Sequence, residues 1–302
     1  MTIVSMIGDC TTTTALALAS AWPAHDPVTV VEADATGGSL SAWLETPRVP
    51  SLATLVASTS RDLDPDDLRH DRQGQTLRGE ATHRSVLEAI GSMTHRPSAG
   101  IAFVAAPTSS VAAARAVDEA AASVFPALAA STHVTALIDG GRHPADARTH
   151  PTAALAHSIV LIHRQETASS RAAAVRLERH AETLERLAAL QRPLVPVLIG
   201  SRPFDPDEID TYVRSHLPSA GSSVVEPHQL LADDALAAAV LAGRSGVSAR
   251  RMRRLPLMRS AAALATRLAE LLERPDPSTS PRPSTTRPTS TAQAKVGAEV
   301  EG

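Results

Sequence analysis

The chain has 302 residues, of which 43% are hydrophobic and only 2% aromatic, and it carries a net charge of −3. This length allows a sizeable core, in one large α/β domain or two smaller ones. The few aromatic residues give poor stacking platforms for single-stranded nucleic acid, and the net charge gives no global attraction to nucleic acid or membranes. The single cysteine, Cys10, excludes a disulfide framework and a zinc motif.

The chain begins directly with a predicted strand, with no basic leader, and no apolar run reaches the ~18 residues of a membrane span. We therefore expect a cytoplasmic protein with no signal peptide and no membrane-spanning helix. Its only lysine, Lys295, lies in a low-complexity C-terminal segment, so arginine carries the basic charge elsewhere.

The first predicted elements are a buried strand, a tight turn at Gly8 and Asp9, and a helix that opens on four threonines. A strand, a glycine-containing turn and such a helix form a phosphate-binding loop, in which free backbone N–H groups and the helix dipole meet an anion. The usual loop, G-x-x-x-x-G-K-[ST], also has a lysine for the phosphates, which is missing here. The alternative is a plain strand–turn–helix with a threonine-rich N-cap, in which Cys10 is a small loop residue.

A second buried strand is predicted at 28–34, followed by a glycine pair and a helix that starts at Ser39. Glu32 and Asp34 therefore lie at the carboxyl end of a strand, where ligands bind in open α/β sheets. The segment 47–96 is interpreted as a surface excursion, helical at 51–58.

The remainder alternates between strands and helices, and Asp139 ends one of the strands. We predict strands at 100–107, 133–139, 158–163, 193–200 and 223–227, and helices at 110–129, 166–190, 204–216, 233–242 and 257–273. Most strands are continuous apolar runs, which indicates a mostly parallel sheet covered on both faces. The fold class is therefore α/β, with a single doubly wound sheet in one domain at 1–273. The Pro/Ser/Thr-rich segment 274–302 is expected to be a disordered tail.

Three segments resemble motifs of the ParA/MinD family of P-loop ATPases: the N-terminal loop, EADATGG at 32–38 and LIDGGR at 137–142. The family has a loop of the form KGGxGKTT, a second strand ending D-x-D-x-x-G, and a later strand ending in Asp. Here Glu32 replaces the first Asp of the second motif. The resemblance extends over most of 2–273 and implies a P-loop NTPase-like fold.

The resemblance also implies ATP and Mg²⁺ as cofactors, a protein partner, a homodimer, and a role in positioning, partitioning or regulation. Asp34 and Asp139 would then be catalytic, and Thr13, Asp34 and Asp139 would hold Mg²⁺. The implied cofactor-binding residues are Gly8, Asp9, Cys10, Thr11, Thr12, Thr13, Thr14 and Pro227.

Both loop lysines of the family are absent. In one alignment Ile7 and Thr12 replace them, and in a second, equally defensible one Thr11 replaces the second lysine. Asp9 adds a negative charge where a triphosphate would lie. We therefore expect weak or lost ATP hydrolysis. The alternative is an active ATPase in which Arg142 or Arg164 supplies the missing charge.

Two further hypotheses follow from the sequence. An arginine cluster could bind DNA phosphates in a partitioning factor, although a solvated helix flank is the simpler interpretation. Its members are Arg250, Arg251, Arg253 and Arg254. A dinucleotide-dependent oxidoreductase is the weakest hypothesis, because no G-x-G-x-x-G follows the first strand. The twelve histidines are scattered, without the spacing of a metal site.

Overall fold

The computed structural model describes residues 2–273 except 24–26, 62–85, 87, 93, 96–100, 131–133, 143–150, 166–168, 201–203 and 217–223. The predicted disordered tail at 274–302 lies outside the described residues, as does the polar part of the predicted surface excursion.

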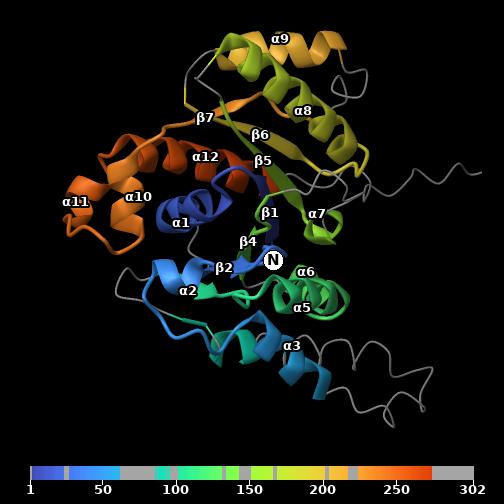
Figure 1. The fold of residues 1–302 in the computed structure, drawn as a ribbon, viewed down its shortest axis with the longest axis vertical. Coiled ribbons are helices and arrows are strands. Elements are labelled where there is room, and N and C mark those ends of the chain that lie inside the picture. Colours follow the sequence, from blue (N-terminus) through green and yellow to red (C-terminus); the bar gives the residue numbers. More distant parts are fainter. Residues whose placement is uncertain are drawn as a thin grey trace, which may run out of the picture.

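The described strands form one seven-stranded sheet in the order β3-β2-β4-β1-β5-β6-β7, and all of their pairings are parallel (Figure 1). The strands are β1 (Thr2–Gly8), β2 (Val28–Glu32), β3 (Ala102–Val104), β4 (Thr135–Asp139), β5 (Ser158–Arg164), β6 (Leu194–Ile199) and β7 (Gln229–Leu231). The chain places β2, β3 and β4 on one side of β1, with β4 inserted between β2 and β1, and then adds β5, β6 and β7 on the other side. This reversal places a crevice beside the carboxyl end of β1, where open α/β sheets bind ligands.

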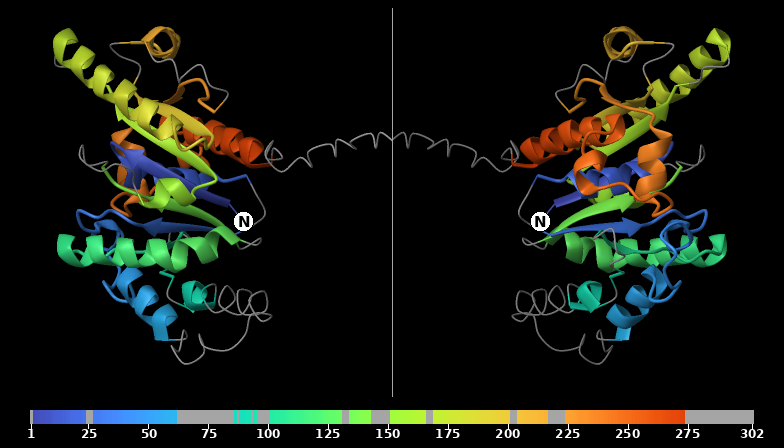
Figure 2. Two further views of the ribbon diagram at one scale, coloured as in Figure 1. Left: turned by 90° about the vertical axis from the view of Figure 1, so that its right-hand side faces the viewer. Right: turned by 90° about the vertical axis from the view of Figure 1, so that its left-hand side faces the viewer.

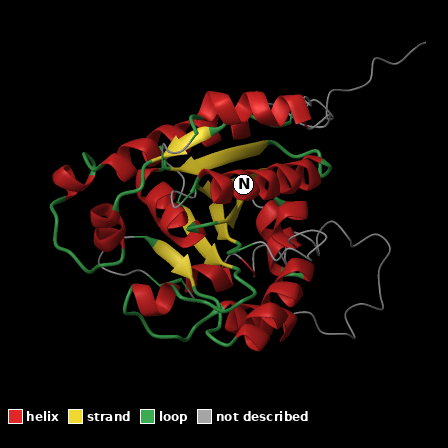
Figure 3. Ribbon diagram, turned by 45° about the horizontal axis from the view of Figure 1, so that its top comes forward, coloured by secondary structure: helices red, strands yellow, loops and turns green. Residues whose placement is uncertain are grey.

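Helices cover both faces of the sheet, as expected for a doubly wound fold (Figures 2 and 3). The helices are α1 (Thr11–Ala21), α2 (Leu40–Trp43), α3 (Leu52–Arg61), α5 (Ser110–Ala122), α6 (Val124–Ala130), α7 (Pro151–Leu155), α8 (Ser170–Ala188), α9 (Pro206–His216), α10 (Ala235–Leu241), α11 (Ala249–Met252) and α12 (Pro256–Glu273). Among the described residues, no helix has the length and apolar character needed to cross a membrane.

The alternation of side chains along the strands creates two separate cores. In β1, Val4 and Met6 pack with α1, α10 and α12, whereas Ile3 and Ile7 pack with the helices of the other face, α3 and α5 to α9. The two-residue period of a strand causes this division, because successive side chains point to opposite faces. Both faces are apolar, which explains why the strands read as continuous hydrophobic runs.

Two predicted elements were wrong in detail. The single helix predicted at 110–129 is divided into α5 and α6 at Ser123, because Pro126 has no N–H and its ring would collide with the carbonyl of Ala122 in a continuous helix. The strand predicted at 223–227 is replaced by β7, which begins only at Gln229. Val225 forms an isolated bridge, and Pro227 cannot donate to a sheet ladder.

Candidate functional site

The turn between β1 and α1 consists of only Asp9 and Cys10. Gly8 has a φ of 120°, and a Cβ at this position would collide with the carbonyl oxygen of Ile162, so the turn requires glycine. The N–H of Gly8 donates to Gly141 O at 3.0 Å, and the N–H of Asp9 donates to Ile162 O at 3.0 Å. The turn is therefore held on both sides by the ends of β4 and β5.

Helix α1 presents its first turn at this edge of the sheet. The carbonyl of Cys10 accepts the N–H and the hydroxyl of Thr14, both at 3.0 Å, but the Cys10 side chain caps no N–H group. The first N–H groups of a helix have no intrahelical acceptor, and the helix dipole favours an anion beside them. This end of α1 therefore retains the backbone features of a phosphate-binding loop.

Asp139 lies beside this helix end and is fully buried. Its carboxylate accepts the hydroxyl of Thr12 at 2.6 Å and the N–H of Gly141 at 3.2 Å. Burial raises the pKa of Asp139, the hydrogen bonds from Thr11, Thr12 and Gly141 oppose this rise, and the charge of Asp34 adds to it.

Asp34 lies close enough to Gly141 that a Cβ there would collide with the Asp34 carboxylate. This carboxylate also accepts the N–H and the hydroxyl of Thr36, at 2.8 and 2.7 Å. Two carboxylates and the Thr12 hydroxyl thus form a set of hard oxygen donors of the kind Mg²⁺ uses. Thr13, the threonine predicted to hold the metal, lines a cavity beside Cys10, and the hydroxyl bonded to Asp139 comes from Thr12.

Glu32 supports the backbone around the site. Its carboxylate accepts the N–H groups of Ser39 at 2.6 Å, Leu40 at 3.0 Å and Ala106 at 3.0 Å. Burial raises the pKa of Glu32, and these bonds counteract the rise. Glu32 therefore anchors the start of α2 and the segment after β3.

Two arginines at the turn, Arg164 and Arg176, are paired with carboxylates. Asp9 accepts a guanidinium N–H of Arg176 at 2.6 Å and the backbone N–H of Arg164 at 3.1 Å. The guanidinium of Arg164 is bonded to Asp233 and reaches the Cys10 sulfur at 3.8 Å. Arg164, which the sequence singled out as a substitute for the lysines, therefore lies beside the turn, but as one half of an ion pair.

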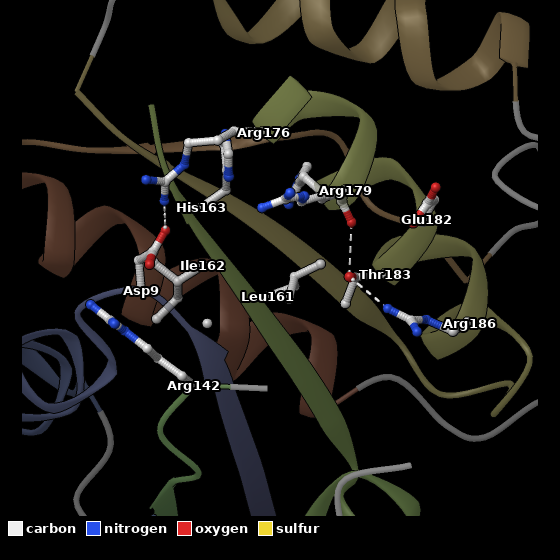
Figure 4. Close-up of a pocket in the computed structure, with 12 residues that line it drawn as sticks. Asp9, Arg142, Leu161, Ile162, His163, Arg176, Arg179, Glu182, Thr183 and Arg186 are labelled. Atoms are coloured by element: carbon white, nitrogen blue, oxygen red, sulfur yellow. Dashed lines mark hydrogen bonds and ion pairs between the residues drawn. The ribbon is translucent and has the colours of Figure 1, made fainter. Parts of the chain in front are cut away.

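Two cavities open on either side of this turn, and they share no residue. The α10 cavity, about 240 Å³, is lined by Cys10, Thr13, Thr14, Arg164, Ile199, residues 231–235, Ala238 and Leu257. The α8 cavity, about 580 Å³, is lined by Gly8, Asp9, Arg142, residues 161–163, Arg176, Arg179, His180, Glu182, Thr183 and Arg186 (Figure 4). One arginine and two aspartates give the α10 cavity an excess of one negative charge, a poor match for a triphosphate.

Most of the predicted site residues meet at this edge: Gly8, Asp9, Cys10, Thr11, Thr12, Thr13, Thr14, Asp34 and Asp139. Pro227 does not join them, because it precedes β7 and therefore lies toward the amino end of that strand. The residues that follow β7, including Asp233, line the α10 cavity instead. Arg142 lines the α8 cavity, on the other side of the turn.

Sequence reasoning missed a buried chain of polar side chains that begins in the wall of the α8 cavity. The rings of His163 and His180 have centroids 4.7 Å apart, His180 Nε2 lies 3.0 Å from His228 Nε2, and His228 Nδ1 lies 2.6 Å from Asp210 Oδ1. The histidines that looked scattered in the sequence therefore include a contiguous group of three. Burial is the largest cause of the lowered pKa values of His163, to about 4, and of His180.

Comparisons with known proteins support the fold. No protein-family model and no curated protein matches the sequence. Solved structures match the fold. The MinD septum site-determining protein of Pyrococcus horikoshii OT3, complexed with Mg-ADP, has a TM-score of 0.57 at 15% identity, covering 90% of this chain and 97% of that one.

Two further structures agree. The ParA family ATPase from Chlorobium tepidum TLS has a TM-score of 0.55 at 14% identity, covering 88% of this chain and 98% of that one. MinD in the MinC:MinD cell division complex of Aquifex aeolicus has a TM-score of 0.56 at 9% identity, covering 89% of this chain and 96% of that one. The parallel sheet, the turn after β1 and these similarities together show that the chain has the ParA/MinD-like P-loop ATPase fold.

Proposed function

We propose that this protein is a positioning or partitioning factor that binds nucleotide weakly or not at all and acts through a protein partner. The observation that carries this proposal is the charge at the β1–α1 turn. Arg176 is neutralised by Asp9, and Arg164 by Asp233. No lysine lies in the turn. A triphosphate placed on the first turn of α1 would therefore meet helix N–H groups but no unpaired cation from Arg164 or Arg176. Arg142, the other arginine suggested by the sequence, lines the α8 cavity on the other side of the turn.

The absence of an unpaired cation from Arg164 or Arg176 should lower the rate of ATP hydrolysis more than the affinity for nucleotide. Removing one group that stabilises the transferring phosphoryl typically lowers the rate by about 10²–10³. The oxygen donors of Thr12, Asp34 and Asp139 fit Mg²⁺, which would supply charge to phosphate oxygens if a nucleotide were bound. We infer that residual nucleotide binding is more readily retained than hydrolysis.

The partner surface in this proposal comprises the segments after Asp34 and Asp139, at the same edge of the sheet. Support comes from the fold: a MinD protein has been solved in complex with MinC, and another with Mg-ADP. In this protein the Asp34 segment is ordered by its own contacts, since Thr36 and Gly37 both donate to Asp34. We propose that residues 1–273 act as one domain that presents this edge, as a monomer or a homodimer.

Calorimetric titration of the purified full chain with ATP, ADP and GTP, each with Mg²⁺, tests the proposal, together with a phosphate-release assay. We expect weak or absent binding and no turnover above background. Tight binding of ATP with steady hydrolysis would refute it.

The second candidate is an ATPase in which arginine replaces the lysines, favoured by the contact between Arg164 and Cys10 at the start of α1. Arg164→Gln and Asp139→Asn should then each abolish ATP hydrolysis. Arg171→Gln, an exposed arginine on α8 that lines neither cavity, is the matched control. Hydrolysis that survives both site substitutions would reject this candidate.

A further inference from the structure

The α8 cavity carries a positive charge, and two of its arginines, Arg179 and Arg186, play no part in the nucleotide-loop hypothesis. Four arginines line it against two carboxylates, which leaves an excess of two positive charges. Its two histidines, His163 and His180, add no charge near neutral pH, because both have lowered pKa values. The larger cavity therefore favours anions, whereas the smaller one beside α10 does not.

The arginines converge on the cavity from two walls. Arg176, Arg179 and Arg186 belong to α8, and residues spaced three and seven apart lie on one face of a helix. Arg142 follows β4 and enters from the opposite side of the cavity, with its side chain extending toward Asp9 (Figure 4). The cavity therefore carries guanidinium groups on both walls.

Two of these guanidinium groups are available to a ligand. Arg176 is engaged with Asp9, and Arg186 donates to the Thr183 hydroxyl at 3.2 Å. Within the part of the chain that the structure describes, the guanidinium groups of Arg142 and Arg179 have no hydrogen-bond or ion-pair partner. Guanidinium presents a planar fork of donors that matches phosphate oxygens, so these two groups define where a phosphate would lie.

We propose that the α8 cavity binds a small molecule with a terminal phosphate or diphosphate group, for which Arg142 and Arg179 supply guanidinium donors. A volume of about 580 Å³ lies within the range of small-molecule sites. A phosphate monoester carries close to two negative charges near neutral pH, since its second pKa is about 6, and this matches the excess charge of the lining. Leu161, whose side chain points to the α8 face of the sheet, provides an apolar contact for the remainder of the molecule.

This inference does not rest on the proposed function. The α8 cavity shares no residue with the α10 cavity, and none of Thr11, Thr12, Thr13 and Thr14 lines it. Gly8 and Asp9 of the turn do line the α8 cavity, but Arg179 belongs neither to the turn nor to the α10 cavity, so the effect of Arg179→Gln separates the two sites.

The test is calorimetric titration of inorganic pyrophosphate into the full chain, at fixed ionic strength and near neutral pH. Arg179→Gln removes one guanidinium, and Arg142→Gln removes the one on the opposite wall. Arg171→Gln is the matched control, because it makes the same charge change on the same helix outside the cavity. Arg142 and Arg179 are exposed, so thermal melts should confirm that the variants fold normally.

We expect saturable binding by the wild type, a loss of affinity of about tenfold or more in Arg179→Gln and in Arg142→Gln, and a change below about twofold in Arg171→Gln. Absence of saturable binding up to ~10 mM would overturn the proposal. So would an equal loss in the control, which would indicate non-specific attraction. A loss in Arg164→Gln but not in Arg179→Gln would place pyrophosphate at α1. Equal affinity for citrate would reject phosphate as the preferred group.

Discussion

His163 should make the fold sensitive to mild acid. The ring is buried on β5, and burial, with a smaller contribution from Arg176, lowers its pKa from 6.5 to about 4, while Asp9 opposes the shift. Between these two values the unfolded chain binds a proton that the folded chain excludes. The stabilisation is therefore fully present above about pH 6.5 and is lost as the pH falls toward 4.

The size of the effect follows from the two pKa values. One unit of pKa corresponds to about 1.4 kcal/mol, and integration from about pH 7.5 to about pH 5 gives a loss of about 2 kcal/mol from this one group. For a domain of this size that loss lowers the melting temperature by about 4–8 °C. His180 shifts in the same direction, whereas the raised pKa values of Glu32 and Asp139 act in the opposite one, so the prediction concerns the difference between the wild type and a variant at position 163.

The assay compares thermal or urea unfolding of the wild type and His163→Phe at both pH values, with His163→Leu as a second non-titrating variant. Phe retains a ring opposite His180, where the centroids are 4.7 Å apart in the wild type. Either variant can differ from the wild type at neutral pH for reasons of packing, so the measured quantity is the loss between the two pH values. This loss should be about 2 kcal/mol smaller in both variants. Equal losses in all three proteins would refute the reasoning.

Three further substitutions test other parts of the structure. Gly8→Ala places a Cβ against the carbonyl of Ile162 at a φ of 120°, and should destabilise the fold by about 1–3 kcal/mol or more in thermal melts; an unchanged melting temperature would contradict the described turn. Glu32→Gln turns an amide toward backbone N–H donors, and should cost about 1–3 kcal/mol in urea unfolding, with Glu119→Gln at an exposed position of α5 as a neutral control. If the arginine cluster binds DNA, the wild type should cause a salt-sensitive mobility shift of DNA. This shift should disappear when the four exposed arginines of the cluster, Arg250, Arg251, Arg253 and Arg254, are all replaced by Gln. No shift by the wild type at low salt would refute that hypothesis.

Local sequence signals were enough to predict the architecture. Alternating apolar runs and amphipathic segments predicted a parallel sheet covered on both faces, because a strand buried on two sides must be apolar at every position. The glycine and threonines of the first turn, and the acids that end β2 and β4, could be assigned to one edge because the carboxyl ends of parallel strands meet there. The predicted boundaries were wrong where a proline interrupts an apolar segment: Pro126 lies within the single helix predicted at 110–129, and Pro227 lies within the strand predicted at 223–227.

The sequence by itself determined the fold and the absence of lysine from the turn. Only the tertiary structure decided where the remaining charges lie. Asp9 meets Arg176 across 167 residues, Arg164 meets Asp233 across 69, and His180 meets His228 across 48. These pairs depend on the order of the strands in the sheet and on the direction in which each side chain points from the backbone. Residue periodicity records which face of an element is buried, but not which distant element will lie against it.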